Sequence, residues 1–387
     1  MGLTAPVRVT DSSRTAVVAA WLIAAFWNAI AWSTAVAAGR ELRDWRLAIV
    51  ALFPVVGVGL LIRAASLTLH RRKYGASFLE LPDGAGVIGL GLTGTVVIPA
   101  GLPVNAAFSV TLRRIVRRRS GSGRTRQTSE SIAWEERTVA SARSDGRTVQ
   151  VPLAYRIPTS ETPSGADEIG RSTVIWRVDV SADVPGVDYR TSFEVPVVSA
   201  ADAGLLAERH DVAAFPPAPD PALYRPPRDS RIQVSSNQRG TEIVYPAARN
   251  PGAAASLTAF FLVWCGAIVA MTAFGAPLLF PIVFGLFAAL LFVGVLQLWL
   301  GVTRVVVERG TVTVTSGLLG GGRPRVVDAA GIAEVTVAIG MQAGGTPYYE
   351  VRIVRTGGRK LAAGSGIRDK REAEWLAHTI RTALADR

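Results

Sequence analysis

Four long apolar stretches, grouped in two pairs, constrain this chain more than any other feature of its sequence. They cover residues 15–38, 47–69, 257–274 and 278–300, and the one charge within them is Arg63, close to the end of the second. About 20 consecutive apolar residues span a bilayer core as a helix, and a terminal arginine can reach the headgroups with its long side chain. The sequence therefore predicts four transmembrane helices in two hairpins, 15–70 and 257–301.

The first apolar stretch must be distinguished from a signal peptide, because Arg8 and Arg14 precede it. It runs for 24 uncharged residues, and the second stretch follows after only eight more. Both features are unusual for a cleaved leader, whose apolar region is shorter. We interpret 15–38 as a retained helix that follows an N-terminal tail, 1–14.

The composition agrees with a membrane protein. Apolar residues make up 49% of the 387 residues, and the formal charge of +12 comes almost entirely from arginine. The abundance of Ala, Gly and Arg is typical of a bacterial protein from a GC-rich genome, which predicts the inner (plasma) membrane. The single cysteine, Cys265, excludes an internal disulfide and a cysteine zinc site.

The basic residues that flank the apolar stretches favour one orientation, since such residues accumulate on the cytoplasmic side. The first hairpin loop carries three arginines, and the second hairpin loop carries none. The opposite side carries seven basic residues: Arg8, Arg14, Arg71, Arg72, Lys73, Arg249 and Arg304. We expect a multi-pass protein with both termini and both soluble segments in the cytoplasm.

The block between the hairpins, 71–210, has the alternation and turn signals of short β-strands. Strands are predicted at 87–99, 108–116, 137–142, 148–157, 174–182 and 191–198. No convincing amphipathic helix interrupts them, which favours a β-sandwich. On the strand at 174–182, alternation predicts that Trp176, Val178 and Val180 point inward. A proline-rich stretch follows, so 211–256 is interpreted as a linker and return segment.

The C-terminal block, 302–387, combines strands with one closing helix. Strands are predicted at 304–309, 311–316, 325–328, 332–337, 348–355 and 360–363, and glycines separate them. Asp369 to Glu372 fits a capping box, and an apolar stripe that includes Leu376 and Ile380 follows it. This order predicts a pleckstrin-homology-like (PH-like) β-barrel with one closing helix. The predicted fold class is therefore an α+β membrane protein.

Several segments of the chain resemble one protein family. They are Trp176–Tyr189, Phe193–Val198, Tyr245–Gly252, Gly340–Tyr349 and Gly364–Glu372. Together they resemble uncharacterised bacterial four-helix membrane proteins with an arrestin-like β-sandwich and a C-terminal PH-like domain. The resemblance implies this architecture for most of the chain past the second helix. Because the family has no assigned activity, the resemblance implies no catalytic residue.

A glycine motif at 84–89 matches the dinucleotide-binding pattern G-x-G-x-x-G. That site requires a helix directly after the glycines, and an acidic residue about 20 positions later. Here a strand-like, glycine-rich segment follows and the acidic residue is missing. We interpret the motif as a turn and a strand, and we predict no cofactor.

The densest charge in the chain is a cluster of seven arginines without an acidic residue. It consists of Arg113, Arg114, Arg117, Arg118, Arg119, Arg124 and Arg126. Such a cluster can bind phosphate groups of lipids or nucleic acids. Nucleic acid is not expected, because no aromatic residue is interleaved for base stacking. The two interpretations that remain are a loop tip that contacts anionic lipid headgroups or a protein partner, and an ordinary solvated loop.

Other candidate chemistry is weaker. Six acidic residues could supply an acid–base pair, namely Glu130, Glu135, Glu136, Asp179, Asp183 and Asp188, but the sequence shows neither burial nor proximity for them. The three histidines lie far apart. Asn28, in the middle of the first apolar stretch, is best explained by a hydrogen bond between helices.

These observations favour a non-enzymatic, membrane-anchored binding or scaffold protein. Its partners would be the lipid bilayer, anionic headgroups and other proteins, whereas its oligomeric state is left open. The alternative is a membrane-surface enzyme that acts on lipid or peptide through an unrecognised active site. A transporter subunit fits least, because the spans hold no deeply placed charge.

Overall fold

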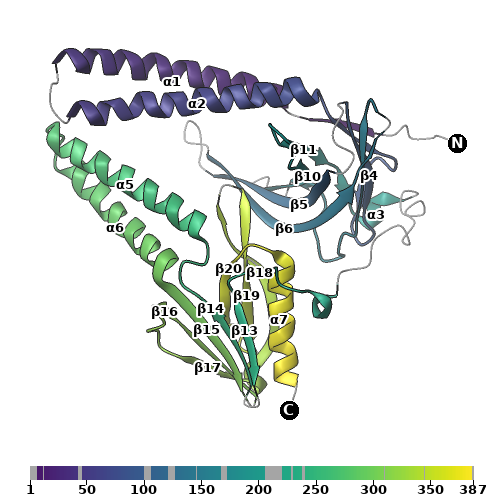
Figure 1. The fold of residues 1–387 in the computed structure, drawn as a ribbon. Helices are drawn as coiled ribbons and strands as arrows, with labels where there is room; N and C mark the ends of the chain where they lie inside the picture. The colour runs from purple at the N-terminus through teal and green to yellow at the C-terminus, as the bar shows by residue number, and fades with distance from the viewer. Residues whose placement is uncertain are drawn as a thin grey trace. The chain divides into compact units, whose positions relative to one another are not determined.

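The computed structural model of the protein describes residues 7–11, 13–41, 46–99, 106–120, 127–144, 146–166, 172–204, 220–227, 230–237, 240–308, 310–343 and 345–385. The chain forms two compact units, Met1–Ala218 and Pro219–Arg387. Each unit contains one pair of long helices together with β-sheets (Figure 1).

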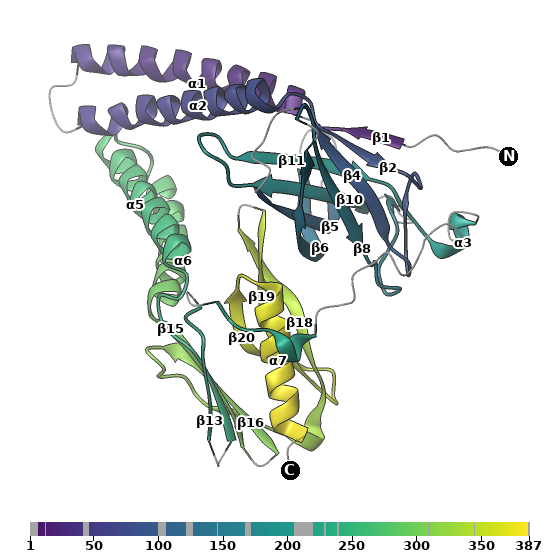
Figure 2. The same ribbon diagram turned by 45° about the vertical axis from the view of Figure 1, so that its right-hand side comes forward.

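The first unit begins with the predicted helical hairpin. Helices α1 (Ser13–Glu41) and α2 (Arg46–Tyr74) lie side by side (Figures 1 and 2). Each contains 29 residues, which corresponds to roughly 43 Å and exceeds the ~30 Å hydrocarbon core. Both contain a stretch long and apolar enough to cross a membrane, at Val17–Gly39 and Phe53–Tyr74. The helices thus extend past their predicted ends, and α2 closes with the basic turn Arg71–Lys73, which suits the negative end of a helix dipole.

Hydrogen bonds join the two helices within their apolar region. The Asn28 Nδ2 atom donates to the carbonyl of Gly57 on α2 at 2.9 Å and to that of Ala24 at 2.8 Å. Two indoles also donate across the hairpin, from Trp21 to Thr68 Oγ1 at 2.9 Å and from Trp27 to the Phe53 carbonyl at 3.0 Å. The interhelical role expected for Asn28 is confirmed.

The β-structure of the first unit is a sandwich of two sheets. One sheet has the order β1 (Val7–Thr10), β2 (Phe78–Leu81), β4 (Leu92–Ile98), β8 (Val149–Tyr155), β7 (Arg143–Ser144). The other has the order β11 (Tyr189–Val195), β10 (Ser172–Ala182), β5 (Ala107–Ser120), β6 (Gln127–Ser141), with β9 (Gly165–Ala166) beside β10. A short parallel pair, β3 (Gly86–Val87) and β12 (Val197–Val198), and the helix α3 (Ala200–Ala203) complete it. The predicted β-sandwich is present.

The core of the sandwich follows the predicted alternation. Trp176, Val178 and Val180 are buried on the inner face of β10, while Arg177 and Asp179 are partly exposed on its outer face. The inner residues pack with those of β4, β8 and β5, including Leu92, Val151 and Phe108. The register expected for β10 is therefore confirmed.

The strand β1 was not expected. It pairs antiparallel with β2, with Val7 opposite Leu81 and Thr10 opposite Phe78, so the tail segment before the first helix belongs to the sandwich. Four residues are too few for a recognisable alternation in the sequence. As a result, the helical hairpin α1–α2 is inserted between two neighbouring strands of one sheet (Figure 2).

The last turn of α2 is fixed to the turn between β10 and β11. The Lys73 ammonium donates to the carbonyls of Pro185 at 2.9 Å and Val187 at 3.3 Å, and the Tyr74 hydroxyl donates to Val187 as well. Tyr189 donates to Ser77 Oγ at 2.9 Å in a buried contact. These bonds hold the end of the hairpin against the sandwich.

The second unit contains the other predicted hairpin. Helices α5 (Pro251–Ala273) and α6 (Leu279–Leu300) are each long and apolar enough to span a membrane. Indoles again join the pair, from Trp264 to the Phe284 carbonyl at 3.0 Å and from Trp299 to Thr258 Oγ1 at 2.9 Å. Four candidate membrane helices in two hairpins are thus found among the described residues.

The strands of the second unit form two sheets. One has the order β13 (Gln233–Asn237), β14 (Gly240–Tyr245), β15 (Gly301–Glu308), β16 (Thr311–Leu318), β17 (Arg325–Asp328). The other consists of β18 (Ile332–Ala343), β19 (Thr346–Arg355) and β20 (Lys360–Ile367). Short 3-10 turns, η3 (Pro221–Leu223) and η4 (Ala329–Gly331), and the helix α7 (Lys370–Ala385) accompany them.

Two expectations for this unit require correction. The strands in the described part of the chain do not close into the predicted PH-like barrel, because β17 and β18 are not paired and the two sheets remain separate. The segment interpreted as a linker and return segment, 211–256, contributes β13 and β14, and β14 pairs antiparallel with β15. The α5–α6 hairpin therefore also lies between two neighbouring strands.

The closing helix is as expected. Leu376 and Ile380 are fully buried in a core with Val305, Val314 and Ile353. The Asp369 carboxylate accepts from the backbone N–H of Arg371 at 2.9 Å, which caps the first turn of α7.

Gly57→Ala should weaken the α1–α2 hairpin, because a Cβ at this position would lie 2.5 Å from the Asn28 Oδ1 atom. Loss of the interhelical hydrogen bond should cost about 1 kcal/mol and lower the midpoint of thermal unfolding in detergent. Gly59→Ala is the matched control, since its Cβ would meet nothing within 4 Å. Equal midpoints for the two variants would contradict the role of Asn28.

Candidate functional site

The structure divides the arginine cluster between the two faces of β5. Arg113 lies opposite Arg177 of β10, which places it on the outer face of the sandwich. Arg114 lies opposite Trp176 and therefore on the inner face. Side chains alternate along a strand, so consecutive arginines cannot act as one patch.

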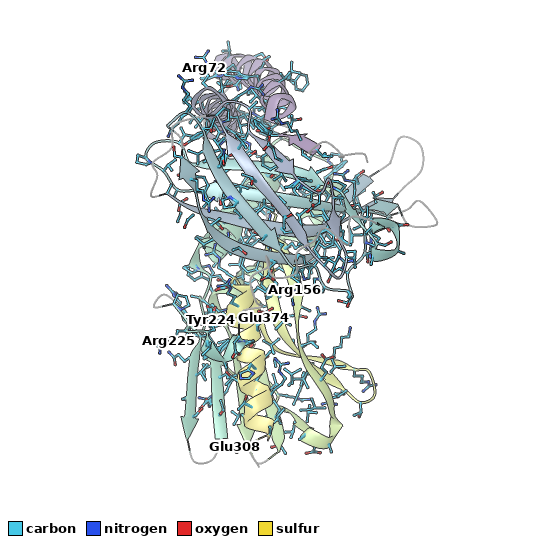
Figure 3. All side chains as sticks on the ribbon, turned by 90° about the vertical axis from the view of Figure 1, so that its right-hand side faces the viewer. Arg72, Arg156, Tyr224, Arg225, Glu308 and Glu374 are labelled. Atoms are coloured by element: carbon cyan, nitrogen blue, oxygen red, sulfur yellow. The ribbon has the colours of Figure 1, made fainter. Side chains whose placement is uncertain are left out.

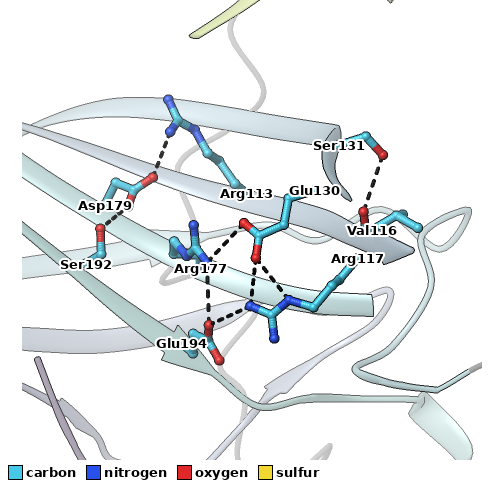
Figure 4. A network of polar contacts seen from close by, with 9 residues as sticks. All are labelled: Arg113, Val116, Arg117, Glu130, Ser131, Arg177, Asp179, Ser192 and Glu194. Atoms are coloured by element: carbon cyan, nitrogen blue, oxygen red, sulfur yellow. Dashed lines mark hydrogen bonds and ion pairs between the residues drawn. The ribbon is translucent and has the colours of Figure 1, made fainter. Parts of the chain in front are cut away.

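The outer face carries a network of ion pairs at Arg117 (Figure 4). Its guanidinium contacts Glu130 Oε1 at 2.7 Å and Glu194 Oε1 at 3.5 Å, and both carboxylates also contact Arg177, at 3.5 and 3.4 Å. The hydrogen bond from Arg117 to Glu130 raises the pKa of Arg117 above its ordinary value. Two arginines and two glutamates from four strands thus neutralise one another.

Arg113 continues this network along the same face. It contacts Glu135 at 3.0 Å. It also contacts Asp179 at 2.9 Å, and Asp179 accepts from the Ser192 hydroxyl (Figure 4). Three arginines of the face, Arg113, Arg117 and Arg177, therefore meet four carboxylates. The local charge is balanced or slightly acidic, which does not suit capture of an anion.

Arg114 is bound on the inner face, at the edge of the core. Its guanidinium contacts Glu161 at 2.8 Å and donates to Thr162 Oγ1 at 2.9 Å. The indole of Trp176 donates to the carbonyl of Thr162 at 3.0 Å. This arginine fixes the segment around Thr162 to the sheet.

Two of the remaining arginines, Arg118 and Arg119, lie near the end of β5. Arg118 is exposed and makes no ion pair with a described residue. Arg119 lies in β5 opposite Thr128. Arg124 and Arg126 lie outside the described residues. The cluster that appears continuous in the sequence is thus a set of bound arginines along the strand and a set near its end.

The glycine motif and several of the acidic candidates have structural roles. Gly84 and Gly89 adopt positive φ, +77° and +84°, in turns on either side of β3, and a strand rather than a helix follows. Among the acidic candidates, Glu130, Glu135 and Asp179 belong to the outer-face network. Within the described residues no group of three or more His, Cys, Asp and Glu side chains is arranged to hold a metal ion.

The second unit contains a half-buried polar junction that sequence reasoning missed. Just before α5, the Arg249 guanidinium donates to the Ser365 carbonyl and Asn250 Nδ2 donates to the Gly366 carbonyl at 2.9 Å. The Tyr245 ring packs directly against Gly364, where a Cβ would lie 2.1 Å from its Cζ atom. The junction connects the start of hairpin 2 to β20. Its only sequence signal is that both segments belong to the quoted family resemblance.

Burial and charge distinguish this junction from the surface. Burial lowers the pKa of Arg249, against the opposing effects of Tyr245 and Glu372, and burial raises the pKa of Tyr245. Glu372 is buried at the start of α7, where it accepts from the Ser230 hydroxyl. The arrangement suits a structural connection between the start of α5 and β20.

A shallow depression lies next to the start of α7. It has a volume of about 350 Å³ and is lined by η3 and α7 residues that include Tyr224, Arg225 and Glu374 (Figure 3). The Tyr224 hydroxyl donates to Asp369 Oδ2 at 2.9 Å, and burial together with this carboxylate raises the pKa of Tyr224. The depression is open and mixed in polarity, unlike the enclosed apolar pockets of most small-molecule sites.

Comparisons with known proteins provide no family for the chain. No protein-family model and no curated protein sequence matches it. Among solved structures it is similar to Spo0M, a sporulation control protein from Bacillus subtilis, with 16% sequence identity over 43% of this chain and 77% of that chain, and a TM-score of 0.24. A superposition this loose carries no functional argument, so the fold assignment rests on the strand pairing.

Gly364→Ala should disturb the polar junction, because its Cβ would overlap the Tyr245 ring. We expect a destabilisation of about 1–3 kcal/mol, typical of overpacking, measured as a lower midpoint of thermal unfolding of the full chain in detergent. Gly357→Ala, at a position with nothing within 4 Å, should leave the midpoint unchanged. An unchanged midpoint for both variants would show that the junction does not stabilise the unit.

Proposed function

We propose that the chain is a non-enzymatic, membrane-anchored binding or scaffold protein that presents two β-domains at the cytoplasmic membrane surface. The observation that carries this proposal is the pairing that brackets each hairpin. Thr10 pairs with Phe78 around α1–α2, and Tyr245 pairs with Thr303 around α5–α6. Each β-domain is thereby held at both ends of its own membrane anchor.

This pairing also supports a common side for both domains. Neighbouring paired strands place the two ends of a hairpin on one side of the bilayer. Between β2 and β14 no described segment is long and apolar enough to span. We propose that both β-domains share a side, and the arginine bias supports the cytoplasm of a bacterial inner membrane. We propose arrestin-like and PH-like relationships for the two domains, on the family resemblance of their sequences.

The ion pairs of the acidic residues in the sandwich support a binding role over catalysis. Three acidic residues of the outer-face network, Glu130, Glu194 and Asp179, are held in ion pairs with arginines. A general acid or base must instead be free to exchange its proton with a substrate. The alternative function is a membrane-surface enzyme, and we identify no comparable group of residues for it in the part of the chain that the structure describes.

The purified full chain, reconstituted in bilayers, should retain stable protein or lipid partners and should not turn over substrates. The measurement combines chemical cross-linking in native membranes with assays of phospholipid and peptide hydrolysis. Steady turnover by the purified chain, abolished by a single substitution, would overturn the scaffold proposal in favour of the enzyme.

We further propose that the arginine cluster has two roles. Arg113, Arg114 and Arg117 stabilise the sheet, because each is bound to carboxylates. Arg118, which is exposed and lies outside these ion pairs, contacts anionic lipid headgroups. Each arginine near such a surface contributes about 1 kcal/mol, and the attraction weakens with salt.

A shortened sandwich tests this division. Because Thr10 and Phe78 are paired neighbours, an Asn-Gly turn can replace the α1–α2 hairpin. The folded product, verified by circular dichroism, should bind vesicles that contain anionic lipid at low salt. Arg118→Ser should weaken binding about fivefold, as expected for about 1 kcal/mol.

The control is Arg117→Ser, which removes a charge that Glu130 and Glu194 already balance. It should leave vesicle binding nearly unchanged. Equal losses for the two variants, or equal binding to neutral vesicles, would show that the cluster acts as an ordinary solvated loop.

A further inference from the structure

The turn between β16 and β17 exposes two leucines. Residues 317–322 read Gly-Leu-Leu-Gly-Gly-Gly, so Leu318 and Leu319 supply the only side chains of the turn. Leu318 is 45% exposed and Leu319 is 74% exposed. Two adjacent exposed leucines are unfavourable at the tip of a hairpin in water.

The backbone of this turn is hydrogen-bonded to the C-terminal end of the candidate membrane helix α6. Leu300 is the last residue of α6, and its carbonyl accepts from the Leu319 N–H at 2.8 Å. Leu318 pairs with Gly301, the first residue of β15. The end of β16 lies beside the foot of α6 in both views (Figures 1 and 2). The turn is therefore held at the level where α6 leaves the apolar region.

Local turn chemistry does not explain a leucine at this position. Leu319 has φ of +53° and Gly320 has φ of +80°, and the Gly321 N–H donates to the Leu318 carbonyl at 3.0 Å. Tight turns with two positive φ values favour Asn, Asp or Gly. A branched side chain with positive φ is strained, and such strain often marks a functional site.

The glycines of the turn make it narrow and rigid. A Cβ on Gly322 would lie 1.8 Å from the Ser316 carbonyl oxygen, and one on Gly317 would lie 2.6 Å from the Gly322 nitrogen. The two chain segments thus touch through their backbones, with no side chain between them. Immediately after the turn, Arg323 and Arg325 are exposed, as is the apolar Val326.

We propose that the turn of Leu318 and Leu319 inserts into the bilayer interface beside the α5–α6 hairpin. The leucines enter the boundary of the acyl chains, and Arg323 and Arg325 lie at the headgroups, which is the usual division of apolar and basic groups at an interface. The occupant of this surface is lipid rather than protein, because the hydrogen bond to Leu300 sets the turn at the membrane boundary. The inference rests on the proposed insertion of α5–α6.

This insertion gives the C-terminal domain a third membrane contact next to the two ends of its hairpin. Two helix ends on neighbouring strands define a line, about which a domain can tilt. A contact at the side of α6 removes that freedom. The turn therefore fixes the tilt of the β13–β17 sheet relative to the bilayer surface.

Spin labels on the full chain in liposomes test the proposal. In a Cys265→Ala background, a nitroxide is attached at Leu319→Cys, at Leu286→Cys or at Glu308→Cys. Leu286 is 67% exposed on α6, and Glu308 is exposed at the far end of β15 from Leu300. Collision with oxygen, which concentrates in lipid, is compared with collision with a water-soluble nickel chelate.

The label at 319 should collide more with oxygen than with nickel, as should the label at 286, whereas the label at 308 should show the reverse. A label at 319 that behaves like the one at 308 would overturn the insertion of the turn while leaving the membrane hairpin intact. A label at 319 that is shielded from both reagents would indicate a protein partner and would also overturn it. If the label at 286 itself favours nickel, the proposed anchoring fails.

Leu319→Asn provides a second variant that should fold, because Asn is favoured at positive φ. Its midpoint of thermal unfolding in detergent should equal or exceed that of the parent chain. A label at Leu318→Cys should collide less with oxygen and more with nickel in liposomes when Leu319→Asn is present. No change in these collisions would contradict the role of Leu319.

Discussion

The backbone ladders β1–β2 and β14–β15 are the constraint on which the rest of the structure depends. Each joins the chain just before a helical hairpin to the chain just after it. A membrane hairpin on a flexible linker would leave its soluble domain free to rotate, whereas one that begins and ends in paired strands is part of the domain. The bonds of Lys73 and Tyr74 in one unit, and of Arg249 and Asn250 in the other, reinforce the same connection.

In the sandwich, folding gives most of the described arginines of the cluster a carboxylate partner. Arg113 and Arg117 have no acidic neighbour in the sequence near them, yet each meets carboxylates from adjacent strands. Partly exposed pairs of this kind contribute little stability singly, and more when several charges form a network. The network also removes the positive field that the sequence suggested. Among the described arginines of the cluster, Arg118 is exposed and lies outside these ion pairs.

In both units the pair of apolar helices begins and ends in paired strands, but the connection between helices and sheet differs. In the first, helices of 29 residues extend beyond the hydrocarbon core, and the sandwich binds the protruding end of α2. In the second, α6 passes directly into β15 at Gly301, so the sheet starts where the apolar helix ends. The exposed Leu318–Leu319 turn occurs only beside this direct junction, where a lipid contact is within reach.

Elements with a local signal could be predicted from the amino-acid sequence alone. Hydropathy located the four helices, alternation oriented Trp176 on β10, and the apolar stripe of α7 placed Leu376 in a core, because each pattern repeats over many residues. Tertiary structure decided which segments meet. The four-residue β1, the ladder of β14 with β15, the division of the arginines and the packing of Tyr245 on Gly364 depend on contacts between residues distant in the chain. No local pattern encodes such contacts, since their energies arise only when the folded backbone brings both partners together.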